Sequence, residues 1–156
     1  MAEVREQIEV DVPVTTAYNQ WTQFEEFPTF MENVESVRQI DDTQLRWVAE
    51  IGGQTHEWTA EITRQEPDRV VAWRSVDGKG TSGEVRFEPI GSDRTRAEVT
   101  MTWEPEGFLE SLGEKLGADT LGVKRDLTNF KQIIESRGAE TGAWRGEVME
   151  GERIDR

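Results

Sequence analysis

Residues 21–37 read WTQFEEFPTFMENVESV, a stretch that places Trp21, Phe24, Phe27, Phe30 and Met31 within eleven residues. A surface loop seldom carries this much aromatic area, because contiguous apolar patches on soluble proteins are usually covered. Another layer of the molecule is therefore expected to lie over these side chains. The end of the stretch is typical of a β-strand, and the rest of the sequence predicts that the cover is a curved sheet with a hollow between.

The residues before this stretch predict a strand followed by a short helix. Apolar and polar side chains alternate over residues 4–12, which indicates a half-buried strand. Pro13 suits the first turn of a helix, and apolar residues then recur at helical spacing as far as Trp21. Phe24 and its neighbours add a second short turn, which Pro28 ends or restarts.

Six further strands are expected after this helical region. Alternating segments separated by Gly, Asp and Pro turns lie at residues 34–40, 45–51, 56–63, 70–75, 83–88 and 97–104. Together with the first strand they predict a seven-stranded antiparallel meander. Glycines at 80, 83 and 91 are expected to supply the kinks or bulges that curl it.

A long C-terminal helix is expected to cover the concave face of this sheet. Leu109, Leu112 and Leu116 lead into it, with Asp119 as a candidate N-cap. Its apolar stripe consists of Val123, Leu127, Phe130 and Ile134, and it ends at Arg137-Gly138. The chain therefore predicts one domain over residues 1–138. The polar segment 139–156 is expected to be a tail, or else to pack over the domain or against a second copy through Trp144 and Val148.

Composition excludes several classes of function. The net charge of −14 opposes a phosphate-neutralising surface, so no nucleic-acid partner is expected. There is no cysteine, so neither a disulfide framework nor a cysteine zinc site is possible. The sequence has neither a secretory signal nor a bilayer-spanning run, and we expect a cytoplasmic protein without integral membrane association.

The order of these elements resembles the α+β helix-grip fold of the START-like, or SRPBCC, superfamily. That superfamily includes the bacterial polyketide cyclase/dehydrase and coenzyme Q-binding proteins. The most specific similarity is the opening IEVDVPVTTAYNQWTQFEEFPTFMENVESV at residues 8–37, and the Trp73-Arg74-Ser75 segment is also similar. The resemblance implies a seven-stranded curved sheet, in the order β-α-α-β6-α, wrapped around the C-terminal helix. The functions that it implies are diverse, because one fold can serve many activities.

Large side chains on the faces predicted to point inward indicate a cavity between sheet and helix. A curved sheet held away from a helix leaves volume that side chains fill or a ligand occupies. The candidate ligand-binding residues are Phe27, Phe30, Met31, Trp47, His56, Trp58, Trp73, Phe87, Met101, Trp103, Val123 and Leu127. Phe27, Phe30 and Met31 are predicted to form an adjustable lip, because they follow the helix and adjoin a proline.

The sequence offers little that indicates catalysis. His56 is the only histidine, and no spacing reveals a carboxylate that would orient it as a general base. Arg74 is predicted to point outward and to pair with a glutamate of a neighbouring strand. We expect no metal site, no cofactor and no catalytic residue.

Three functions remain open from the sequence. The first is binding or carriage of an apolar small molecule, such as a lipid, an isoprenoid quinone or a polyketide-like aromatic. The second is a polyketide cyclase, aromatase or dehydratase, which requires His56, Arg74, Ser75 or Thr120 to converge inside the pocket. The third is a protein-interaction module, and the tail could also support a homodimer.

Overall fold

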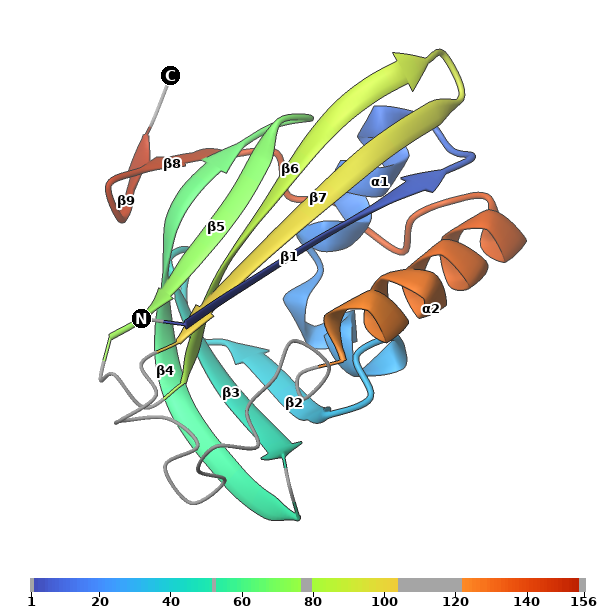
Figure 1. The fold of residues 1–156 in the computed structure, drawn as a ribbon. Helices are drawn as coiled ribbons and strands as arrows, with labels where there is room; N and C mark the ends of the chain where they lie inside the picture. The colour runs from blue at the N-terminus through green and yellow to red at the C-terminus, as the bar shows by residue number, and fades with distance from the viewer. Residues whose placement is uncertain (1, 52, 77–79, 104–121, 155–156) are drawn as a thin grey trace.

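The structure is a computed structural model, and it describes residues 2–51, 53–76, 80–103 and 122–154. Its main feature is one curved antiparallel sheet with two helical layers inside the curve (Figure 1). The expected α+β helix-grip architecture is confirmed. The strands of the meander run β1-β7-β6-β5-β4-β3-β2 across the sheet, so the first strand lies beside the seventh. Their bounds are β1 Ala2–Val10, β2 Val34–Gln39, β3 Gln44–Ile51, β4 Gln54–Glu66, β5 Val70–Ser75, β6 Thr81–Gly91 and β7 Arg94–Trp103.

The alternation in the sequence decides which face of each strand is buried. Leu45, Trp47 and Ala49 of β3 are buried, while the residues between them are only partly covered. The same holds for the inward sets of β4, β6 and β7, except that His56 and Met101 are only partly buried. A register shift between Pro89 and Gly91 marks the expected bulge in β6.

Two glycines allow indole rings to lie against the sheet. A Cβ added at Gly80 would come within 2.1 Å of the Trp58 ring, and one at Gly83 within 2.5 Å of Trp73. Because no real Cβ tolerates such distances, these positions require glycine for close approach. The ring of Trp58 therefore lies close to Gly80, just before β6, and the ring of Trp73 lies close to Gly83 within β6.

The long helix α2 (Val123–Arg137) lies across the open side of the sheet (Figure 1). Its predicted stripe is confirmed, since Val123, Leu127, Phe130 and Ile134 are all buried. Gly138 ends the helix with a left-handed backbone (φ 70°), and its N–H donates to the carbonyl of Ile134. The candidate N-cap Asp119 lies outside the described residues.

The predicted lip differs from the structure at two of its three residues. The helix α1 (Val14–Trp21) is followed by the 3₁₀ helix η1 (Phe24–Thr29), which continues through Pro28. Phe27 and Phe30 are buried in an aromatic cluster, with their ring centroids 5.3 Å and 5.2 Å from that of Trp21. They are core residues, because the turns of η1 direct both rings inward. Met31 is only partly buried.

The described chain contains nine strands rather than the predicted seven. The two additional strands, β8 (Glu147–Met149) and β9 (Glu152–Ile154), form a small hairpin after α2. β8 pairs with the second half of β4, opposite Arg64 and Gln65. Val148 is fully buried there, so this segment packs over the domain of its own chain.

Candidate functional site: an apolar pocket beneath the sheet

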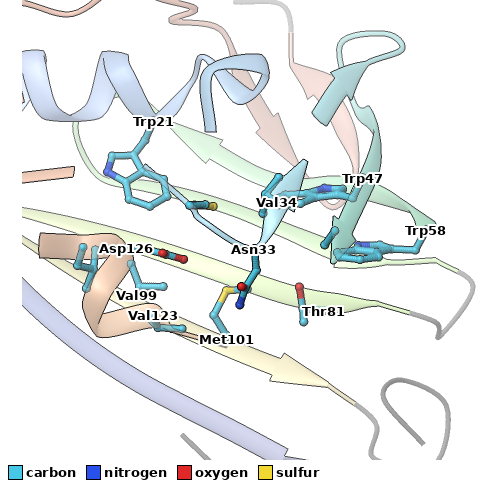
Figure 2. A pocket seen from close by; sticks show the side chains of 13 residues that line it. Trp21, Asn33, Val34, Trp47, Trp58, Thr81, Val99, Met101, Val123 and Asp126 are labelled. Atoms are coloured by element: carbon cyan, nitrogen blue, oxygen red, sulfur yellow. The ribbon is translucent and has the colours of Figure 1, made fainter. Parts of the chain in front are cut away.

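A pocket opens between the sheet, α1, the start of β2 and the first turns of α2 (Figure 2). Residues 31–33 connect η1 to β2 beside this pocket, and we call them the lip in place of the predicted set Phe27, Phe30 and Met31. The wall of the pocket is almost entirely apolar, and the exceptions are Asn33, Thr81 and Asp126. The lining residues are Trp21, Met31, Asn33, Val34, Trp47, Ala49, Trp58, Thr81, Val99, Met101, Val123, Asp126 and Leu127.

The pocket is narrow in its present conformation. The space that the centre of a water molecule can occupy is about 60 Å³, inside a recess of about 570 Å³ that includes its open mouth. Small-molecule sites usually have volumes of about 300–1,000 Å³. A ligand of ordinary size therefore requires side chains of the wall to move, and the unbranched Met31 and Met101 are suited to this.

Six of the twelve predicted binding residues line this pocket. They come from four different parts of the chain: the lip, the paired strands β3 and β4, strand β7, and helix α2. Trp47 and Trp58 face each other across paired strands, with ring centroids 5.7 Å apart and planes 8° from parallel. The six residues are Met31, Trp47, Trp58, Met101, Val123 and Leu127.

The other six lie elsewhere in the structure. Phe27, Phe30 and Trp73 belong to the aromatic cluster behind the wall, where the Trp73 ring stacks on Trp47 at 5.6 Å. Phe87 packs edge-on against Tyr18 of α1, 5.6 Å away. Trp103 is buried at the end of β7, and His56 is half-buried on β4.

Seven lining residues were not among the predicted site residues. Ala49 and Val99 lie on faces that the alternation already assigns inward, and Trp21 was predicted only as core. The most informative omission is Asp126, because an acidic residue on an amphipathic helix is ordinarily expected to face water. The sequence did contain one indication that Asp126 faces inward. It lies three residues after Val123, and residues at this spacing share a helix face.

Asp126 is held on the wall by contacts to one of its two oxygens. Oδ1 accepts the backbone N–H of Glu32 at 3.3 Å and the Nε and Nη2 of Arg125, each also at 3.3 Å. The side chain is only 14% exposed. Burial raises the pKa of Asp126 from 3.8 to about 6, although the Glu32 N–H and the Arg125 guanidinium act in the opposite direction.

Further polar contacts fasten the lip to α2. Arg125 pairs with the Glu32 carboxylate at 2.8 Å. The Asn129 amide donates to the carbonyl of Phe30 and to Glu32 Oε2, both at 3.2 Å. These groups lie largely at the surface, where such bonds exchange with water at little cost. These side-chain contacts therefore contribute little to the stability of the fold.

The residues that catalysis would require do not gather in the pocket. Arg74 is 64% exposed and pairs with Glu61 of β4 at 3.0 Å, as predicted from its outward position. Ser75 is half-buried at the end of β5 and accepts the backbone N–H of Gly80 at 3.2 Å. Neither of these, nor His56, lines the wall. Thr120 lies outside the described residues.

Two searches of the described residues found nothing. No group of three or more His, Cys, Asp or Glu side chains within them is arranged to hold a metal ion. None of the described helices has both the length and the apolar character needed to cross a membrane.

Comparison with known proteins identifies the family. Residues 10–131 match the model of the family described as polyketide cyclase / dehydrase and lipid transport. The chain belongs to this family. The match covers most of the sheet and the first part of α2, and it confirms the resemblance to the START-like superfamily.

A curated protein and several solved structures are also similar to this chain. An uncharacterized 17.2 kDa protein of Streptomyces lincolnensis, from the melC2-rnhH intergenic region, is 48% identical over 150 residues, which are 96% of this chain and 100% of that protein. A crystal structure from Deinococcus radiodurans is 30% identical with a TM-score of 0.70, over 88% of this chain and 99% of that one. The Zhui aromatase/cyclase of a Streptomyces species shares the fold at 18% identity, with a TM-score of 0.61 over 87% of this chain and 92% of its own.

Proposed function

We propose that this protein binds and carries an apolar small molecule in the pocket between the sheet and α2. The observation that carries the proposal is the wall itself, in which three tryptophans and two methionines surround a recess with few polar groups. Burial of apolar ligand surface against such a wall is favourable at about 25 cal/mol per Å². Flexible methionines allow one wall to fit ligands of different outline.

Uptake in this proposal begins at the lip. Met31 and Asn33 lie on the wall, and the polar contacts of Glu32 and Asn129 fasten the same segment to α2. Breaking these surface contacts lets Met31 swing away and enlarges the narrow cavity. The buried rings of Phe27 and Phe30 behind the lip remain in place.

The test is native mass spectrometry of protein purified from its host without detergent or organic solvent. We expect wild-type protein to carry a non-covalent apolar molecule that organic extraction releases. Ala49→Leu fills the recess and should reduce this occupancy strongly. Ala72→Leu, at a half-buried alanine of β5 outside the wall, is the matched control. A wild-type mass equal to that of the bare chain, or equal occupancy in Ala49→Leu, would contradict the proposal.

The arrangement of polar residues favours binding over the alternative cyclase or dehydratase. Such an enzyme was predicted to need His56, Arg74 and Ser75 on the wall, and Arg74 is instead engaged with Glu61 on the outer face. Replacing Arg74 by Gln should therefore leave ligand occupancy unchanged.

A cytoplasmic location, the lack of a nucleic-acid partner and the homodimer stay predictions from the sequence. Sedimentation of the full chain tests the homodimer.

A further inference from the structure

The wall of the pocket contains a single charged side chain, Asp126, among its thirteen lining residues. Figure 2 shows its carboxyl pointing from α2 into the pocket. The two other polar lining residues are Asn33 of the lip and Thr81 at the start of β6. A carboxyl in apolar surroundings is costly unless a partner compensates it. Its retention on this wall therefore needs an explanation.

The two oxygens of this carboxyl differ in their surroundings. Oδ1 takes the N–H of Glu32 and the guanidinium of Arg125, and these contacts fix the plane of the group. Among the described residues, none donates a hydrogen bond to Oδ2. The fixed oxygen belongs to the structure of the lip, whereas the second oxygen offers lone pairs to whatever occupies the recess.

We propose that Oδ2 of Asp126 accepts a hydrogen bond from a hydroxyl group, phenolic or alcoholic, at one end of an otherwise apolar ligand. The inference rests on the proposed function, because it names the polar end of the ligand that the pocket holds. The tryptophans and methionines contact the apolar body, and the carboxylate orients it. Asp126 thus determines specificity within an otherwise permissive wall.

A neutral hydroxyl fits this carboxyl better than a cationic amine does. Arg125 already pairs with Asp126 at 3.3 Å, so much of the negative charge is compensated before a ligand arrives. An ammonium would have to leave water for an apolar wall, where an incompletely paired charge is expensive. A hydroxyl loses far less on desolvation, and it still gains a hydrogen bond to a charged acceptor.

The experiment compares three probes that share one apolar body. Isothermal titration calorimetry at pH 7.5 measures 4-butylphenol, 4-butylanisole, which lacks the donor, and 4-butylbenzylamine, which carries a cation. We expect the phenol to bind about tenfold more tightly than the anisole, as for a hydrogen bond to a charged group. Tighter binding of the amine than of the phenol would overturn the preference for a neutral hydroxyl.

The decisive variant is Asp126→Asn. Asparagine keeps an oxygen for the Glu32 N–H but presents an amide NH₂ donor where Oδ2 stood, so the preference should fall to about one or reverse toward the anisole. Asp93→Asn removes the same charge from an exposed turn and should keep the wild-type ratio. The assignment would be overturned if Asp126→Asn left the ratio of phenol affinity to anisole affinity unchanged. It would also be overturned if that preference were lost only in Thr81→Val.

The two proposals fail in different ways. If neither the phenol nor the anisole binds wild-type protein, apolar binding itself is wrong and the inference falls with it. If both bind equally and Ala49→Leu abolishes both, apolar binding stands and the role of Asp126 is wrong.

Near pH 5 the carboxyl of Asp126 is largely protonated and can itself donate a hydrogen bond, so the preference for the phenol over the anisole should shrink. Among the residues that the structure describes, the charged groups facing this carboxyl are Arg125 of α2 and Glu32 of the lip.

Discussion

The backbone N–H of Glu32 donates to Oδ1 of Asp126 across 3.3 Å, which joins the lip of the pocket to the first turn of α2. The two residues are 94 positions apart in the sequence. This bond couples the entrance of the site to the one charged side chain among the described lining residues. The protonation state of one carboxyl therefore affects both the stability of the fold and the closure of the lip.

Asp126→Asn should stabilise the protein at neutral pH but not at acidic pH. The pKa of Asp126 is about 6 in the folded protein and 3.8 ordinarily, so folding favours the protonated carboxyl. The folded state therefore loses stability as pH rises from about 4 through 6, where the carboxyl becomes charged. At 1.36 kcal/mol per pH unit this difference corresponds to at most about 3 kcal/mol. Urea unfolding at pH 4.5, 6 and 7.5 measures the gain, with Asp93→Asn as the control. A gain that does not change with pH would contradict this account.

Phe30→Ala should cost about 3–5 kcal/mol of unfolding free energy, as for other buried phenylalanines. The Phe30 side chain is 2% exposed, and its ring centroid lies 5.3 Å from that of Phe130 on α2. Met31→Ala, one residue later on the wall, should cost clearly less and mainly alter ligand uptake. Chemical denaturation of both variants measures the difference. Equal losses would mean that Phe30 and Met31 do not differ in role.

Gly80→Ala should destabilise the protein by about 1–3 kcal/mol, the usual range for overpacking. The new Cβ would lie within 2.1 Å of the Trp58 ring, which must then move away from its stacked position against Trp47. Gly91→Ala is the control, because no atom lies within 4 Å of its Cβ position. Thermal unfolding and tryptophan fluorescence report both effects. An unshifted emission spectrum in Gly80→Ala would contradict the close approach.

Val148→Ala should lower the unfolding free energy by roughly 2 kcal/mol, since the side chain is fully buried. Met149, its neighbour in β8, is an exposed residue, so Met149→Ala should change stability little. Denaturation of the two variants distinguishes a docked strand from a loose tail. Equal and negligible effects would contradict the docking of β8 on β4.

Most of the sheet could be predicted from the sequence because its strands are long and half-buried. Alternation over β3 and β4 assigns Trp47 and Trp58 to one face without ambiguity. Strand β8 has only three residues, which is too short for a periodic pattern, and its pairing with β4 is a tertiary effect. The sequence predicted only a short turn at Phe24, and not the 3₁₀ helix η1, whose period of three residues places Phe24, Phe27 and Phe30 on one face and Met31 off it. Asp126 was missed because an amphipathic pattern assigns every acid to water.

The pairing of β8 with β4 also affects how one copy of the chain can associate with another. β3 pairs with β4 only as far as Glu61, and β8 then takes the adjoining positions at Arg64 and Gln65. Without β8, the backbone N–H and C=O groups on that side of β4 would form an open sheet edge, which is a template for pairing with another molecule. The C-terminal segment is thus a guard against edge-to-edge aggregation, and a chain that lacked it would be prone to assemble with its own copies.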